Sequence, residues 1–185
     1  PGELTLNTTA FTSGANLASL IAPANIDAAA EKEARKIAIK VVDAMEFVGL
    51  MAVELFLNTD GEILVNEVAP RTHNSGHHTI EGNSTSQFAQ HLRTVVGFPL
   101  GSTALLHNAA GMINLLGAEG AHGKPVYEGL GTAIEMEGVN PHLYGKSTVK
   151  PHRKMGHITV TGLSMEEVQN KLLKLQKLVR VTGTE

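Results

Sequence analysis

The sequence predicts an α+β fold: an antiparallel sheet with helices, followed by a smaller strand-rich part. Three observations support this class. Two alternating apolar runs flank the turn sequence at residues 58–61, Asn-Thr-Asp-Gly, which is typical of a β-hairpin. Apolar residues recur at helical spacing on both sides of this hairpin. Beyond residue 100 the apolar runs become shorter, so we expect one domain over 1–100 and a second over 101–185.

The first predicted helix covers residues 27–47. Asp27 suits the N-cap, because its carboxylate can accept a hydrogen bond from the first turn, and Gly49 ends the pattern. Its apolar stripe consists of Ala34, Ile37, Ala38, Val41, Val42 and Met45. The hairpin strands follow over 50–57 and 62–68. Pro70 ends the second strand, since proline has no N–H for a ladder bond.

A second helix is predicted over 84–96, capped by Ser84 and stopped by Gly97. Pro99 and Gly101 then mark a boundary. The side chains expected to pack on this helix are Phe88, Leu92 and Val95 or Val96.

The sequence after residue 101 predicts several short elements and one long helix. Strands are expected over 112–116, up to Val149 and over 158–161; a short helix is one interpretation of 124–137. Turns are predicted at residues 12–14 and 140–141. Ser164 and Glu167 form a capping box that opens the last helix. The buried stripe of that helix is Met165, Val168, Leu172, Leu175 and Val179.

Two glutamates of the hairpin are candidate metal ligands. With a two-residue turn, Glu54 lies opposite Glu67, and two carboxylates in an apolar hairpin repel unless a cation such as Mg²⁺ binds them. With a three-residue loop, Asn58 pairs with Glu62 and Glu54 faces Asn66 instead. In that register the two glutamates point to opposite faces and are ordinary solvated residues.

A polar segment from Arg71 to Thr79 follows the hairpin directly. It holds His73, His77 and His78 and no apolar side chain, which is typical either of a functional loop or of a solvated one. No cysteine and no helical histidine pair supports a zinc site.

A second polar cluster lies at residues 150–154. Lys150, Arg153 and Lys154 are three cations within five residues, which can bind a phosphate or form a solvated basic turn.

Composition excludes several classes of protein. The chain has 185 residues, no cysteine and a net charge of −3, so neither a disulfide framework nor general nucleic-acid binding is expected. Aromatic residues are 4%, too few for a stacking platform for single strands. No apolar run reaches the ~20 residues that span a membrane.

The residues 66–77, Asn-Glu-Val-Ala-Pro-Arg-Thr-His-Asn-Ser-Gly-His, closely resemble a signature of 5-(carboxyamino)imidazole ribonucleotide synthase, an ATP-grasp enzyme of purine biosynthesis. Supporting matches run from Ile21 to the Arg-Lys-Met-Gly-His sequence at 153–157. The resemblance implies the C-terminal part of an ATP-grasp domain with an antiparallel sheet and helices, then a small β-rich C-terminal domain. It also implies ATP, Mg²⁺ (or Mn²⁺), bicarbonate and aminoimidazole ribonucleotide as ligands.

The resemblance also implies roles for residues. Glu54 and Glu67 would hold the metal, with Asn66 and Glu67 as candidate cofactor-binding residues, although on a regular strand these two face opposite sides. Arg71, His73 and Asn74 would be catalytic, with His73 suited to proton transfer.

Substrate binding is expected on both polar clusters. The residues concerned are Asn74, Ser75, Lys150, Arg153 and Lys154, the last three at the 5′-phosphate. Lys150 stands where arginine is common in the family, which keeps the charge but loses the planar fork.

The family also has a nucleotide-binding N-terminal half, with a Rossmann-like domain and phosphate-binding lysines. Residues 1–20 contain no glycine-rich phosphate loop, so we expect this chain to be the C-terminal half and to be inactive alone. A cytoplasmic homodimer is typical of the family. Alternatives are a non-catalytic anion- or nucleotide-binding module and a different ATP-grasp carboxylase.

Overall fold

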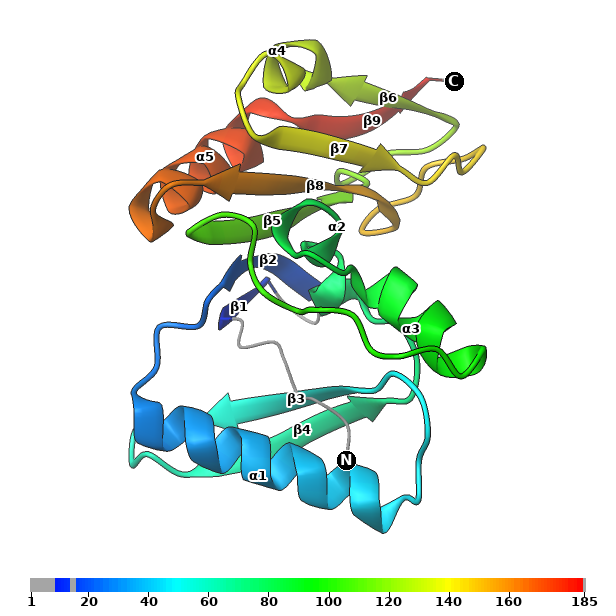
Figure 1. Cartoon of the computed structure of the whole chain (residues 1–185). Coiled ribbons are helices and arrows are strands. Elements are labelled where there is room, and N and C mark those ends of the chain that lie inside the picture. The colour runs from blue at the N-terminus through cyan, green and yellow to red at the C-terminus, as the bar shows by residue number, and fades with distance from the viewer. Residues whose placement is uncertain (1–8, 14–15, 185) are drawn as a thin grey trace.

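A computed structural model describes residues 9–13 and 16–184 and confirms the α+β class (Figure 1). Before residue 100 its elements are β1 (Thr9–Ser13), β2 (Asn16–Ala22), α1 (Ala28–Ala44), β3 (Ala52–Leu57), β4 (Ile63–Ala69), the 3-10 turn η1 (Asn74–Gly76), α2 (Thr79–Gly82) and α3 (Gln87–Val95). After it come β5 (Ala109–Leu116), β6 (Lys124–Glu128), α4 (Leu130–Ile134), β7 (Val139–Leu143), β8 (Lys154–Gly162), α5 (Met165–Leu178) and β9 (Arg180–Thr184).

All strand pairs of the described residues are antiparallel. The largest sheet has the order β1-β2-β5-β8-β7, and β3-β4 and β6-β9 form two-stranded sheets. In Figure 1 the hairpin β3-β4 and α1 form a layer apart from the five-stranded sheet. None of the described helices is long and apolar enough to cross a bilayer.

Helix α1 begins as predicted. The Asp27 carboxylate accepts a hydrogen bond of 2.7 Å from the N–H of Ala30. The helix ends at Ala44, three residues before the predicted end, and packs on β3 and β4. Only Ala38 of its apolar stripe is fully buried, because a two-stranded hairpin covers little of the helix.

The hairpin leaves a large apolar surface exposed. Phe56, Leu57, Leu64 and Val65 are each between 45% and 58% exposed. Neighbouring apolar side chains exposed in this way are typical of a surface that another segment or molecule covers.

Strand β2 connects the two halves of the sequence. It pairs with β5, with Ala22 opposite Ala110 and Ser19 opposite Ile113. Strand β2, which precedes residue 100, therefore lies in the same sheet as β5, β8 and β7, which follow residue 100. The domain boundary near residue 100 stays a prediction.

The main hydrophobic core lies between the five-stranded sheet and α5. The helix begins at its predicted cap, with Ser164 Oγ accepting from the N–H of Glu167 at 3.1 Å. The predicted capping box is only half formed, because the Glu167 carboxylate accepts from the N–H of Leu163 at 2.8 Å and not from that of Ser164. Of its predicted stripe, Val168, Leu172 and Leu175 are buried against β5 and β8.

The two faces of this sheet differ in chemistry. A Cβ on Gly111 would meet Leu172 of α5, whereas a Cβ on Gly82 of α2 would meet the Ala110 side chain. Because neighbouring residues of a strand point to opposite faces, α5 and α2 cover opposite sides of β5. The α2 side carries a cross-strand row in which Asn114 pairs with His157 and His157 with His142.

Several predictions about α3 are wrong. Its N-cap is Ser86, whose Oγ accepts from the N–H of Ala89, and Ser84 lies outside the helix. The side chains expected to pack against the protein are exposed, Leu92 by 63% and Val95 by 68%. The buried side chains of this helix are those of Gln87 and Gln90. The polar side of this helix faces the protein because its glutamines bond to backbone groups.

The later short elements also differ from prediction. Residues 124–137 hold strand β6 as well as the short helix α4. Residues 140–141 lie in β7 rather than a turn; β7 is an edge strand, where a proline removes no essential ladder bond. Val149 belongs to no strand but is buried within the loop before β8. Strand β9 was not predicted. Residues 12 and 13 are in β1, and residue 14 lies outside the described residues.

Candidate functional site

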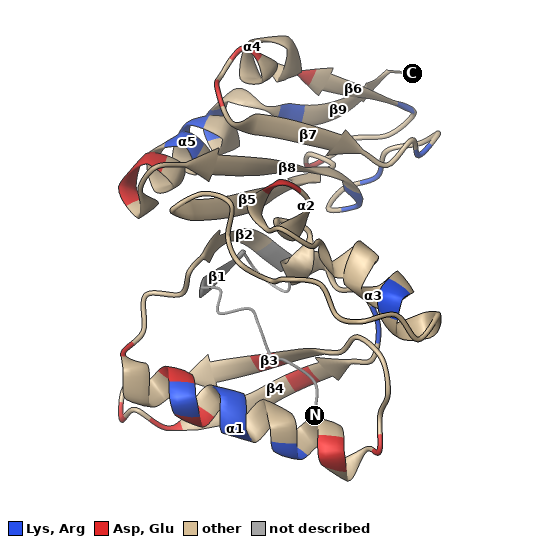
Figure 2. Ribbon diagram, viewed as in Figure 1, with Lys and Arg blue, Asp and Glu red and all other residues tan. Residues whose placement is uncertain are grey.

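A β-bulge brings the two glutamates of the hairpin face to face. Near the turn the chain follows the three-residue loop, with the N–H of Asn58 donating to the carbonyl of Glu62 at 3.0 Å. The register then shifts between Glu54 and Leu55, so that Glu54 lies opposite Glu67. Each alternative register is therefore correct for one part of the hairpin. Figure 2 shows the acidic positions side by side on β3 and β4.

Asn66 is the extra residue of this bulge. Its Nδ2 lies 3.4 Å from Glu54 Oε2. The expectation that Asn66 faces away from the glutamates holds for a regular strand and is wrong here, since a bulge breaks the alternation of side chains. Asn66 thus lies on the same side as the two carboxylates.

His73 lies between the carboxylates. Its Nδ1 is 3.4 Å from Glu54 Oε1, and its Nε2 is 3.4 Å from Glu67 Oε1. Ser75 fixes the ring, because its Oγ lies 2.9 Å from Nδ1 and its backbone N–H points to the same nitrogen. Nδ1 is then an acceptor, and the ring proton on Nε2 faces Glu67.

The two carboxylates, with His73 beside them, form a group that could hold a divalent cation. Each offers one ligand atom, and these atoms lie within 4.8 Å of one another. At that separation two carboxylate charges repel by about 0.9 kcal/mol even in water-like surroundings. Mg²⁺ takes one or two carboxylates and completes its shell with phosphate oxygens and water. The donor set of Glu54 and Glu67 matches that preference.

Residues from beyond position 100 complete the cluster. Lys154 donates from Nζ to Asn74 Oδ1 at 3.0 Å, and Asn74 exchanges amide hydrogen bonds of 2.8 and 2.9 Å with Asn114. Burial lowers the pKa of Lys154, while the nearby charges of Glu54 and Glu67 oppose that shift. A half-buried ammonium group thus lies close to both carboxylates.

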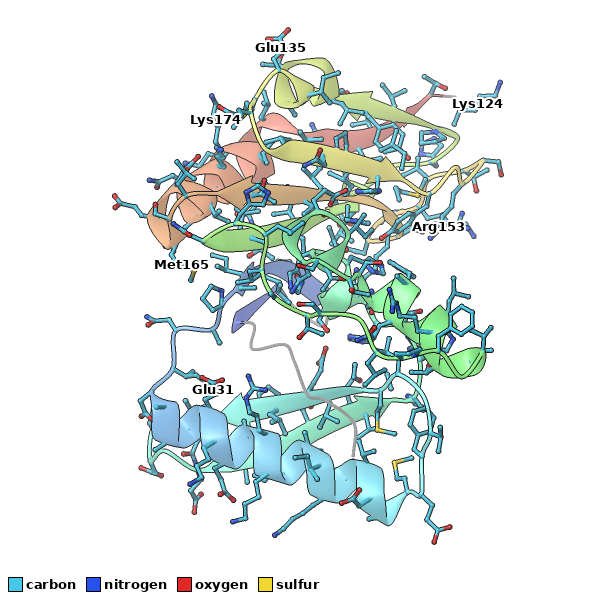
Figure 3. The ribbon with its side chains drawn as sticks, in the orientation of Figure 1. Glu31, Lys124, Glu135, Arg153, Met165 and Lys174 are labelled. Carbon is cyan, nitrogen blue, oxygen red and sulfur yellow. The ribbon has the colours of Figure 1, made fainter. Side chains whose placement is uncertain are left out.

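The other predicted cations lie at the rim. Arg71 is exposed and donates to the carbonyl of Thr72 at 2.9 Å. Arg153 is held on its loop by the carbonyl and hydroxyl oxygens of Thr148, at 2.9 and 3.1 Å. Figure 3 shows Arg153 beside the start of β8, and Lys150 is exposed on the same loop. The roles of these residues stay predictions.

Three histidines, His77, His142 and His157, form a cluster of rings next to the site. The ring of His157 stacks on His142, with centroids 4.5 Å apart, and lies 4.8 Å from His77. Glu81 Oε1 is 2.7 Å from His142 Nε2. Burial is the main cause that lowers the pKa of His77 to about 4 and that of His157 to about 3, so both rings are neutral at pH 7.

Several members of this neighbourhood were not identified from the sequence. Asn114 lies within an apolar strand pattern, and His142 directly follows the turn predicted at residues 140–141. Their approach to the 73–81 segment depends on the pairing of β5, β8 and β7, which no local pattern reveals. A lone asparagine inside an apolar run was the one available signal.

Comparison with known proteins gives two domain matches. Residues 8–88 match the ATP-grasp domain, and residues 110–171 match the phosphoribosylaminoimidazole carboxylase C-terminal domain. The N5-carboxyaminoimidazole ribonucleotide synthase of Bacillus subtilis is 48% identical over 139 residues, which are 75% of this chain and 35% of that protein.

Solved structures agree. The N5-carboxyaminoimidazole ribonucleotide synthetase of Thermotoga maritima has 51% identity and a TM-score of 0.86 over 90% of this chain and 46% of its own. The synthase of Aspergillus clavatus in complex with ADP and 5-aminoimidazole ribonucleotide has 33% identity and a TM-score of 0.82, over 92% of this chain and 46% of its own. The chain spans about half the length, or less, of these relatives.

Proposed function

We propose that this chain works as the C-terminal half of an N5-carboxyaminoimidazole ribonucleotide synthase. Its matches to an ATP-grasp domain and to a phosphoribosylaminoimidazole carboxylase C-terminal domain, in that order along the chain, support this proposal. The reaction is an ATP-dependent carboxylation. ATP phosphorylates bicarbonate to carboxyphosphate, and the amine of aminoimidazole ribonucleotide then captures the carboxyl group with release of phosphate.

One observation carries this proposal. Glu54, Glu67 and His73 from the ATP-grasp segment meet Lys154 from the C-terminal domain, through Asn74, at a single place. Carboxylates for a metal and a half-buried cation for an anion are the groups that a phosphate-activated carboxylation needs. A module that only binds an anion has no use for the opposed carboxylates.

On the nucleotide side, Glu54 and Glu67 would hold Mg²⁺, which when bound neutralises charge on the phosphates. Asn66 adds an amide beside Glu54. Arg71 follows Glu67 by four residues, and its exposed guanidinium would bind bicarbonate or carboxyphosphate. His73, whose ring lies between Glu54 and Glu67, would exchange a proton with the substrate amine.

On the substrate side, Lys154 and Asn74 form a hydrogen-bonded pair beside this centre, and Ser75 holds the ring of His73. Arg153 and Lys150 lie on the loop that leads into β8 and would bind the 5′-phosphate. The positive charge of this loop matches a phosphate dianion. A homodimer stays a prediction.

The test uses the complete protein that contains this chain. ADP formation that requires both aminoimidazole ribonucleotide and bicarbonate is the expected activity. Glu67→Gln should abolish it with the fold intact by circular dichroism, because the variant loses a metal carboxylate. Glu62→Gln on the same hairpin is the matched control and should retain it. Wild-type turnover by Glu67→Gln would contradict the metal assignment, and turnover with a different amine would indicate another ATP-grasp carboxylase.

A further inference from the structure

Gln87, the first residue of α3, is bound to the main chain of His73. The N–H of His73 donates to Gln87 Oε1 at 2.9 Å, and Gln87 Nε2 donates to the carbonyl of His73 at 2.7 Å. His73 is in an extended conformation, so the amide pairs with it as a neighbouring strand would. Gln87 is 5% exposed. A Cβ on Gly76 would lie 2.4 Å from its Oε1, so glycine there leaves room for the amide.

The same amide also contacts His77. Gln87 Nε2 lies 2.8 Å from His77 Nδ1. An amide nitrogen only donates, so Nδ1 must accept, and the neutral ring carries its proton on Nε2. One amide group of Gln87 thus sets the backbone position of His73 and the tautomer of His77.

We propose that Gln87 is a positioning residue of the site. It holds the ring of His73 between the two carboxylates by fixing the backbone of that residue, and it keeps His77 as an Nε2–H donor. This inference rests on the proposed function for its effect on turnover, but its effect on the tautomer does not. A displacement of about 1 Å in a catalytic group can cost 100-fold in rate.

Gln90, one turn later on α3, provides a matched internal control. Its Oε1 accepts from the N–H of Gly101 at 2.9 Å, and its Nε2 donates to the carbonyl of Gly101 at 3.0 Å. Gln90 is 8% exposed, so its burial and its bonding resemble those of Gln87. Its partner lies in the loop after α3 and not at the carboxylates. A purely structural role predicts equal consequences for both glutamines.

The first experiment compares Gln87→Met with Gln90→Met in the complete protein. Methionine has a similar length but neither donates nor accepts strongly, so both variants lose two backbone hydrogen bonds. We expect similar losses of melting temperature, with kcat reduced about 10- to 100-fold only in Gln87→Met and the KM for ATP changed less than about twofold. Equal kcat values in the two variants would overturn the proposal.

The second experiment does not depend on turnover. Nitrogen-15 NMR of histidine-labelled protein should show His77 protonated on Nε2 in the wild type. In Gln87→Glu a carboxylate oxygen replaces the donor, so the proton should appear on Nδ1, while Gln90→Glu should leave His77 unchanged. An unchanged tautomer in a folded Gln87→Glu variant would overturn the proposal. If the wild type lacks synthase activity, the proposed function fails, and this experiment still decides whether Gln87 sets the tautomer of His77.

Discussion

His157 makes the stability of the protein depend on pH. Its side chain is 3% exposed, and its Nε2 has no hydrogen-bond partner among the residues that the structure describes. Burial, with the neighbouring rings of His77 and His142, lowers the pKa of His157 to about 3. In the unfolded chain a histidine has a pKa of about 6.5. Between these two values the unfolded state therefore binds the additional proton.

The free energy of unfolding should fall as the solution is acidified. The contribution of His157 is fully present above pH 6.5 and is lost progressively as the pH falls toward 3. From pH 7 to pH 5 this single group should remove roughly 2 kcal/mol, because the slope approaches 1.4 kcal/mol per pH unit below 6.5. The pKa values of His77 and His78 are lowered to about 4, mainly by burial, and act in the same direction.

Urea unfolding at pH 7 and pH 5 measures this effect. His157→Gln removes the titrating ring and also a 3.0 Å contact with the hydroxyl of Tyr144, which lowers stability at both pH values. The informative quantity is the difference between the two pH values, which should shrink by roughly 2 kcal/mol in the variant. His107→Gln, at an exposed loop position, should behave as the wild type. An undiminished difference in His157→Gln would refute the reasoning.

Three further predictions concern the metal, a helix cap and the core. At a Mg²⁺ concentration ten times the wild-type dissociation constant, thermal unfolding should show a stabilisation of about 1.4 kcal/mol that Glu67→Gln largely loses; an equal rise in melting temperature would exclude Glu67 as a ligand. Ser86→Ala should cost about 1 kcal/mol by urea unfolding because it removes the cap of α3, and Ser84→Ala should be near neutral; the reverse order would restore the cap predicted from the sequence. Leu175→Ala should cost about 2–5 kcal/mol because Leu175 is fully buried, whereas Leu173→Ala, at a position 50% exposed, should cost little; similar losses would place the core elsewhere.

Local sequence signals predicted the two long helices and the hairpin correctly, whereas the strands β5 and β8 are longer than predicted. The caps at Asp27 and Ser164 and the hairpin around residues 58–61 involve contacts between residues close in the chain, so their patterns are visible without the fold. The cap of α3 was misplaced by two residues, since two serines compete and only the start of the helix distinguishes them. The prediction of the buried face of α3 was wrong, because the side chains that contact the protein on this helix are glutamines that form hydrogen bonds, not apolar residues.

The sequence predicted only part of the candidate site. Glu54, Glu67 and His73 do lie together, and Lys154 approaches them. The bulge at Asn66 was not predicted, because one inserted residue changes the register without changing the alternation that the sequence shows on either side. Asn114 reaches the site through pairing of strands that are distant in sequence, which requires the tertiary fold.

The pairing of β2 with β5 has a consequence for recombination between relatives. A chimaera joined near residue 100 would take β2 from one parent and β5, β8 and α5 from the other, so the new seam would run through the middle of a sheet. The strands pack tightly at Gly111, since a Cβ there would lie 2.8 Å from the backbone carbonyl of Leu20. Exchange should therefore succeed when β2 travels with the C-terminal segment, although the two lie about 90 residues apart in the chain.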